Sequence, residues 1–236
     1  MSYQSSSVLL DQLGWINVQL DKEIIDFLWK RIDKSKKESA KKTLAGNISQ
    51  SYSITDENNY FFRKVLYPLC MEYVDNQTSS INNAHNLSLP VEEDMEIYLH
   101  SFWVNHQKKY EINPIHDHTG LFSFVIWMKI PYDCEEQIKL PFLNGVMEEN
   151  RKAGTFEFQY MDMYGKIVNH SYMLSPEFEG RMLFFPSNLR HMVYPFYECD
   201  EDRISISGNI WSKPIREKYI KRINQVNINY QSQVKA

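Results

Sequence analysis

From residue 92 onward, short stretches rich in aromatic and β-branched residues follow one another, separated by turns that contain Pro or Gly. The stretch over 95–105 alternates apolar and polar residues, and the stretch over 121–130 is apolar almost throughout. Several short strands separated by such turns are typical of an all-β sandwich or barrel. We therefore expect a mainly β fold for this part of the chain. Further strands are expected over 155–160, 168–173, 181–185 and 203–211.

The residues before 91 show a different pattern, in which apolar residues recur at helical spacing. This spacing predicts a helix over 21–37, which begins at an Asp, and a second helix over 58–74. The segments over 44–56 and 76–86 are polar, so we expect a loop and a surface connection there.

Together these patterns indicate one domain that spans residues 1–236. Its expected parts are a helical N-terminal part over 1–90, a β core over 91–212, and a C-terminal helix or tail over 213–236. The N-terminal helices are expected to pack on the β core.

The composition narrows the class of protein. With 43% hydrophobic and 14% aromatic residues, the chain is not mainly disordered. Lys and Arg number 26 against 30 Asp and Glu, a net charge of −4, so no nucleic-acid partner is expected. No apolar run approaches the roughly 20 residues of a membrane span, and the N-terminus lacks the features of a secretory signal. We therefore expect a cytoplasmic protein without a membrane partner, whose oligomeric state the sequence leaves open.

Two of the seven histidines, His116 and His118, stand two residues apart just before the apolar stretch that starts at Leu121. In a strand, residues two apart point to the same side, so both imidazoles can face one point. Imidazole is a common ligand for iron, zinc and copper, and the pair could supply two ligands of a metal site. By itself, a His-x-His pair is more typical of an exposed strand than of a metal site.

The later segment over 180–211 adds a third histidine, His191, and a strand with an informative alternation. Its polar face carries Arg203, Ser205, Ser207 and Asn209, while Ile residues occupy the other face. A barrel interior that holds an Arg and hydroxyl groups suits an anionic ligand, because a guanidinium binds a carboxylate through two parallel hydrogen bonds.

The order of these motifs, His-x-His followed by FFPS, a His and RISISGNIW, resembles the double-stranded β-helix of Fe(II)- and 2-oxoglutarate-dependent oxygenases. The resemblance covers roughly residues 103–211 and is strongest to oxygenases of marine bacteria and phages, which would place a phage-encoded protein in the host cytoplasm. It implies a jelly-roll or cupin-like fold, with His116 and His191 as ligands of Fe(II). It also implies that Arg203 and Ser205 bind the distal carboxylate of the cosubstrate 2-oxoglutarate.

One position departs from the usual pattern, since His118 stands where the family normally has Asp or Glu. We interpret the metal site as three histidines, His116, His118 and His191. Asp117 is the alternative ligand, although it should point to the opposite face. A second alternative pairs His118 with Gly120 and leaves one coordination position vacant, as in halogenating relatives.

Three further residues are candidates for contacts with the cosubstrate. Trp103 and Asn105 share one face of an early strand and could line the cavity, and Asn209 shares the face of Arg203. A packed Trp or a strand-end Asn would explain the same residues without a ligand. No catalytic residue beyond the metal ligands is expected.

The resemblance implies an iron enzyme that hydroxylates a substrate and releases succinate and CO₂. A catalytically silent cupin-like protein with a binding or structural role is an alternative, which the missing acidic ligand favours. A three-His metal dioxygenase that does not use 2-oxoglutarate is another. Loops build the entrance to such a site and carry specificity without a readable code. A small molecule and a peptide therefore both stay open as substrates.

Overall fold

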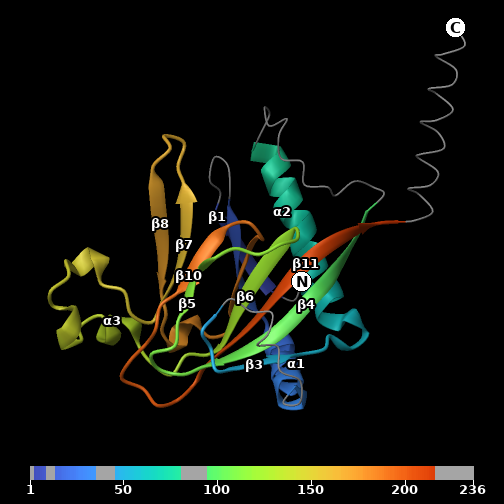
Figure 1. The fold of residues 1–236 in the computed structure, drawn as a ribbon. Coiled ribbons are helices and arrows are strands. Elements are labelled where there is room, and N and C mark those ends of the chain that lie inside the picture. The colour runs from blue at the N-terminus through green and yellow to red at the C-terminus, as the bar shows by residue number, and fades with distance from the viewer. Residues whose placement is uncertain (1–2, 9–13, 36–45, 81–94, 216–236) are drawn as a thin grey trace, which may run out of the picture.

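Two antiparallel β-sheets face each other in the computed structural model, which describes residues 3–8, 14–35, 46–80 and 95–215 (Figure 1). The larger sheet has seven strands in the order β1-β2-β9-β6-β11-β4-β3, and the smaller has four in the order β5-β10-β7-β8. The strands are β1 (Tyr3–Val8), β2 (Trp15–Leu20), β3 (Gln50–Ser53), β4 (Met95–Gln107), β5 (Asn113–His116), β6 (Phe122–Lys129), β7 (Thr155–Met161), β8 (Ile167–Met173), β9 (Arg181–Pro186), β10 (Arg190–Val193) and β11 (Arg203–Pro214). This is the double-stranded β-helix, or jelly roll, that the sequence predicts.

Helical segments join and cover these sheets. The helices are α1 (Lys22–Lys34), a π-helix (Phe62–Leu66) that continues into α2 (Tyr67–Ser80), and the short α3 (Cys134–Gln137). Single 3-10 turns lie at Glu57–Asn59, Pro141–Leu143, Glu148–Asn150 and Pro176–Phe178. Among the described residues, none of the helices is both long enough and apolar enough to cross a bilayer.

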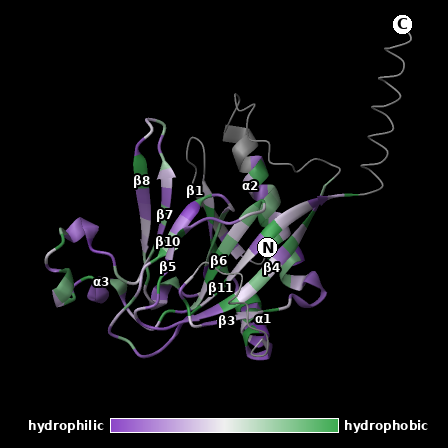
Figure 2. Ribbon diagram, viewed as in Figure 1, coloured by the Kyte–Doolittle hydropathy of each residue, from purple (hydrophilic) through white to green (hydrophobic). Residues whose placement is uncertain are grey.

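Strand β6 shows how the sequence places the larger sheet between two layers. Phe124 and Ile126 pack into the core on the helix side of this sheet, whereas Val125 and Trp127 pack into the core between the two sheets. Because side chains alternate along a strand, an almost continuous apolar run is what a strand buried on both faces needs. In Figure 2 the hydrophobic colour accordingly concentrates in central strands such as β6, whereas the region around α3 shows both hydrophilic and hydrophobic segments.

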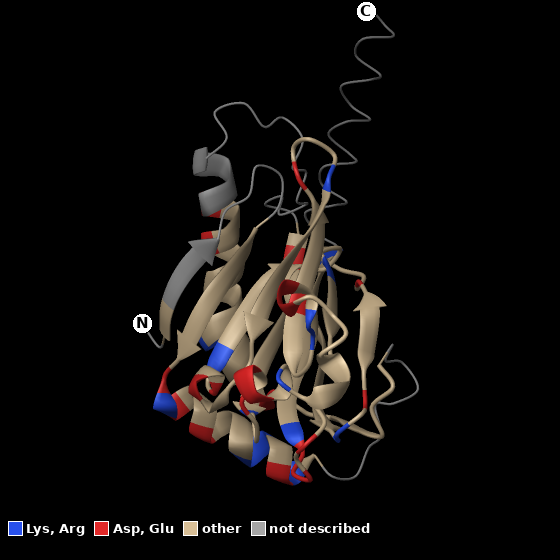
Figure 3. Ribbon diagram, turned by 90° about the vertical axis from the view of Figure 1, so that its left-hand side faces the viewer, with Lys and Arg blue, Asp and Glu red and all other residues tan. Residues whose placement is uncertain are grey.

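The N-terminal helices cover the outer face of the larger sheet. Ile24 and Leu28 of α1 and Leu69 of α2 are fully buried in the same core as Phe102 and Phe124 of the sheet. The opposite face of α1 carries charges of both signs (Figure 3). Both expected helices are therefore confirmed within the described residues, and α1 ends at Lys34.

The part of the chain before residue 91 also contains strands that its pattern did not predict. Strands β1 and β2 pair with each other and join the larger sheet along β9, and β3 lies in the segment over 44–56 that was expected to be a loop. The prediction of a loop was wrong at Gln50–Ser53, because this edge strand is short and mostly polar. Most of the connection expected over 76–86 and of the tail expected over 213–236 lies outside the described residues; α2 reaches Ser80 and β11 reaches Pro214.

Candidate metal centre

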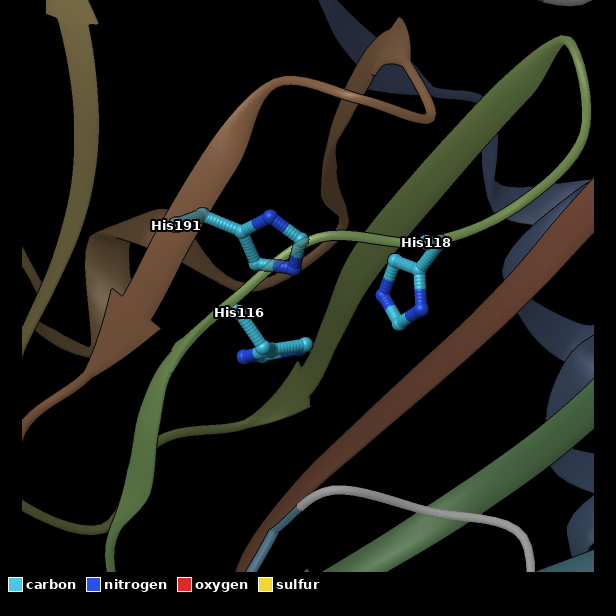
Figure 4. Close-up of side chains that lie close together, drawn as sticks. All are labelled: His116, His118 and His191. Carbon is cyan, nitrogen blue, oxygen red and sulfur yellow. The ribbon is translucent and has the colours of Figure 1, made fainter.

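Three imidazoles converge between the two sheets (Figure 4). His116 ends β5, His118 lies in the loop that follows, and His191 lies on β10. One ring nitrogen from each histidine lies within 4.8 Å of the nitrogens of the other two. His191 and His116 are direct partners in the antiparallel pairing of β10 and β5, so the ladder itself brings two of the rings together. The third ring, that of His118, comes from the loop after β5 rather than from the strand itself.

Backbone carbonyls fix the orientation of two of these rings. Nδ1 of His116 donates a hydrogen bond to the carbonyl of Pro114 at 2.6 Å, and Nδ1 of His191 donates to the carbonyl of Leu189 at 2.9 Å. A carbonyl can only accept, so each Nδ1 carries the proton and each Nε2 keeps its lone pair. A metal-binding histidine needs this tautomer, and such bonds through the other ring nitrogen are typical of metal sites.

Burial keeps the three rings uncharged. Desolvation lowers the pKa of His116, and desolvation together with the neighbouring His116 lowers the pKa of His118 to about 4. The pKa of His191 lies well below its ordinary value, first because of burial and second because of the two other histidines. Neutral imidazole is the form that binds a metal ion, so the site is ready for a cation at neutral pH.

Aromatic side chains enclose His191, which is 5% exposed. The ring of Phe156 stacks near it at 5.7 Å between centroids, and Phe185 meets it edge-on at 4.9 Å. These rings belong to the core between the sheets. They remove water from one side of the cluster and leave the cavity side open to a ligand.

Arg203 lies in the same cavity as the three histidines, and its side chain is almost fully buried. Its guanidinium donates hydrogen bonds to the hydroxyl oxygen of Tyr132 and to Oε1 of Gln107, both neutral acceptors. None of the ion pairs formed by the described residues involves Arg203. A buried cation without a carboxylate partner calls for an anionic ligand, because an uncompensated buried charge is costly.

The acceptors of Arg203 are themselves held in place. The Tyr132 hydroxyl donates to the carbonyl of Gly154 at 3.0 Å, so its lone pairs face the guanidinium. Nε2 of Gln107 donates to the carbonyl of Glu111 at 2.6 Å, which turns Oε1 toward Arg203. The rings of Tyr132 and Phe196 stack on each other at 4.6 Å between centroids, and both lie near the guanidinium, whose carbon is 5.8 and 5.7 Å from their centroids.

Most of the other residues singled out from the sequence line this cavity. Trp103, Asn105 and Ser205 do so, and the Trp103 ring lies 6.1 Å from that of His118. Oδ1 of Asn105 accepts a hydrogen bond from Ser51 at 2.7 Å, which fixes the orientation of its amide.

Two candidates lie elsewhere. Asn209 is not among the residues that line the cavity, and its amide oxygen accepts a hydrogen bond from Ser123 at 2.8 Å. Asp117 is exposed and lies outside the cluster of three histidines. The structure therefore brings His116, rather than Asp117 or Gly120, to the side of His118 and His191.

Sequence reasoning missed the two acceptors of Arg203. Gln107 shares the strand face of Trp103 and Asn105, so extending the same alternation by two residues would have found it. Tyr132 lies beyond the end of β6 in a chain with 15 tyrosines, and no sequence signal distinguishes it.

One protein-family model matches part of this chain. Residues 101–209 match the family model described as "Putative 2OG-Fe(II) oxygenase", and this stretch contains the three histidines, Arg203 and Ser205. No curated protein matches the chain significantly.

Solved structures are similar at low identity. A prolyl-4-hydroxylase from Pseudomonas putida is 15% identical, with a TM-score of 0.44 over 83% of this chain and 91% of that one. A 2OG-Fe(II) oxygenase family oxidoreductase from Burkholderia pseudomallei is 10% identical, with a TM-score of 0.35 over 88% of this chain and 73% of that one.

Proposed function

We propose that the chain is an Fe(II)- and 2-oxoglutarate-dependent oxygenase that hydroxylates a substrate, with His116, His118 and His191 as the iron ligands and Arg203 as the anchor of 2-oxoglutarate. The match of residues 101–209 to the family model described as "Putative 2OG-Fe(II) oxygenase" supports this proposal. One observation carries the proposal. Three neutral imidazoles and a buried guanidinium with only neutral partners line one cavity. The guanidinium suits an anionic ligand, and the three imidazoles suit a metal ion.

The donor set fits the ion that the family uses. Imidazole nitrogen is a good ligand for Fe(II), and three such ligands leave coordination positions for a cosubstrate and for O₂. With Fe(II) bound, the centre would couple the conversion of 2-oxoglutarate and O₂ to succinate and CO₂ with the transfer of one oxygen atom to a substrate C–H bond.

The three histidines would bind without losing protons at neutral pH. Because their pKa values are lowered, the metal does not have to displace a proton from any of them. The Pro114 and Leu189 carbonyls hold two rings in the binding orientation before any ion arrives. Phe156 and Phe185 keep bulk water away from His191.

Arg203 would bind the distal carboxylate of 2-oxoglutarate. A guanidinium has five N–H donors, and Tyr132 and Gln107 take one each, so donors are left for a second pair of acceptors. Ser205 lines the cavity as well and offers a hydroxyl to the same carboxylate. Since Tyr132 and Gln107 are uncharged, they do not neutralise the guanidinium, and its full positive charge would be available to the carboxylate of 2-oxoglutarate.

A metal dioxygenase that does not use 2-oxoglutarate is the second candidate, and the all-histidine ligand set favours it. A catalytically silent binding protein is the third. The three differ in whether metal and 2-oxoglutarate bind together, which one spectroscopic titration can decide.

The test is the anaerobic addition of Fe(II) and then 2-oxoglutarate to the full chain. The proposal predicts a weak visible charge-transfer band that needs both additions and that His191→Ala abolishes, followed by succinate release on exposure to O₂. Fe(II) binding without any response to 2-oxoglutarate would support the second candidate. A folded protein that binds neither would support the third.

A further inference from the structure

Two of the three clustered histidines lie on paired strands, whereas His118 lies in the connection between β5 and β6. Backbone hydrogen bonds hold this connection at both ends. The amide of His118 donates to the carbonyl of Ser187 at 2.8 Å, and the amide of Leu121 donates to the carbonyl of Ile210 at 2.8 Å. The residues between them, Thr119 and Gly120, are exposed.

Trp211 of β11 holds this middle part. Its indole Nε1 donates a hydrogen bond to the carbonyl of Thr119 at 3.1 Å, one residue beyond His118. Gly120 adopts φ = +113°, and a Cβ added to it would lie 2.4 Å from Cδ1 of Trp211. The indole therefore occupies the space that any other residue at position 120 would need.

A β-bulge in β4 brings a second residue, His100, against the indole. Strand pairing moves from Asn209↔Ser101 to Ile210↔Leu99, which leaves His100 as the extra residue of β4. The ring of His100 stacks on that of Trp211 at 4.0 Å between centroids and 16° between planes. Bulges redirect side chains and recur beside functional sites.

We propose that Trp211 is a positioning residue that fixes the loop of His118, so that the third imidazole is in place before a metal binds. The inference rests on the proposed function in one respect, namely that His118 is a ligand. Trp211 contacts the Thr119 carbonyl and Gly120, and it acts on His118 through the backbone.

The first test uses hydrogen exchange of the metal-free full chain. Trp211→Phe keeps a ring beside Gly120 and His100 but removes the N–H donor. One hydrogen bond less should make the His118 and Leu121 amides exchange about fivefold faster. Amides of β7 should keep their rates, and Trp29→Phe on α1 is the matched control. Unchanged rates at 118 and 121, or equal acceleration throughout the sheets, would overturn the proposal.

The second test measures Co(II) affinity from its visible absorption. The apparent affinity for Co(II) is proportional to the fraction of molecules in which the His118 loop is in its binding position. If Trp211→Phe lowers that fraction about fivefold, Co(II) binding should weaken about fivefold. In a His118→Ala background the same substitution should change the affinity less than twofold, because the loop then carries no ligand. An equal loss in both backgrounds would show a general structural role and contradict the proposal.

Gly120→Ala provides a second variant that leaves the indole intact. Its Cβ would meet both Trp211 and the Ile210 carbonyl, at 2.4 and 2.8 Å, so the loop must move. We expect a larger effect than for Trp211→Phe in both tests, confined to the same amides. If wild-type protein binds no Co(II), the proposed function fails, and the exchange rates still decide whether Trp211 holds the loop.

Discussion

His118 brings a neutral imidazole to the cluster of three histidines. Three neutral ligands would leave a bound divalent ion with its full charge, whereas a carboxylate at position 118 would lower the net charge of the site by one. His118→Ala should weaken Co(II) or Fe(II) binding at least tenfold, and His118→Asp should recover much of that loss because a carboxylate is also a ligand. Isothermal titration measures both. The neighbouring Asp117→Asn, at an exposed position, is the control; equal affinity in all variants would make His118 a bystander.

Arg203 carries a prediction of its own. Its replacement by Ala should weaken 2-oxoglutarate binding by about 1.5–3 kcal/mol, the worth of a charge-assisted hydrogen bond. Equilibrium titration of the Fe(II)-loaded protein gives the affinity. Arg190→Ala, which removes an exposed guanidinium from β10, should leave it unchanged. Unaltered affinity in the Arg203 variant would mean that another group binds the carboxylate.

The lowered pKa of His118 makes the stability of the metal-free protein depend on pH. Folded His118 titrates at about 4 against an ordinary value of 6.5, so between these values the unfolded chain binds a proton that the folded chain does not. The free energy of unfolding therefore falls as the pH falls through this window. His118→Ala should reduce the slope by up to about 1.4 kcal/mol per pH unit.

Urea unfolding in the presence of EDTA, at several pH values from 7.5 to 4.5, measures this slope. Above pH 7 His118 is neutral in both states, so wild type and variant should change in parallel there. Identical slopes below pH 6 would contradict the lowered pKa.

The residues of the cavity were only partly predictable. His116 and His118 could be found from their two-residue spacing, although His118 lies in the loop after β5, and Arg203 and Ser205 from the alternation of their strand. His191 was assigned through the resemblance to the oxygenase family. Asn209 has the same spacing, yet its amide accepts a hydrogen bond from Ser123, its pairing partner on β6. The spacing within one strand does not show which residue of the neighbouring strand a side chain contacts. Tyr132 contacts Arg203 from the loop beyond β6. Because residues in a loop do not repeat at a regular spacing, the sequence pattern could not predict this contact.

At the scale of elements, the long central strands were predictable and the edge strands were not. Strands β4, β6 and β11 are 13, 8 and 12 residues long, so their patterns extend over many residues, and β6 is buried on both faces. Strand β3 has four mostly polar residues, and its place depends on pairing with β4 rather than on its own composition.

Close packing in β11 gives a prediction at this scale. A Cβ at Gly208 would lie 2.6 Å from Cζ of Phe124 and 2.7 Å from the carbonyl of Ser101, neither of which can withdraw easily. Gly208→Ala should lower the free energy of unfolding by about 1–3 kcal/mol, as overpacking of a dense core does. Urea denaturation measures the change. Gly145→Ala is the control, because nothing lies within 4 Å of the added carbon.

Across the whole molecule, the larger sheet separates two apolar cores that lie on its opposite faces. One core joins this sheet to the helices, and the other lies between the two sheets around His191. We infer that the described parts form one folding unit, because neither core is complete without this sheet.

Two core substitutions test the division. Leu69→Ala on α2 and Phe158→Ala on β7 each remove a fully buried side chain, and each should cost about 2–5 kcal/mol of stability. Phe158 lies 6.3 Å from His191 between ring centroids, so only its replacement should also weaken Co(II) binding. Thermal unfolding and metal titration well below the transition separate the two effects. Weaker binding in the Leu69 variant would show that the helix layer helps to shape the site.

The position of His116 on β5 has a mechanical consequence. This four-residue strand lies at the edge of the smaller sheet, and among the described strands it pairs only with β10, at His116 and Asn113. A metal ion bound by both His116 and His191 would cross-link β5 to β10. This cross-link would stabilise the edge of the smaller sheet more than the few backbone hydrogen bonds between the two strands do. Removal of the metal by a chelator should therefore destabilise β5 before the other strands. Protease cleavage near residue 113 would then report the loss of the metal while the rest of the two sheets stays folded.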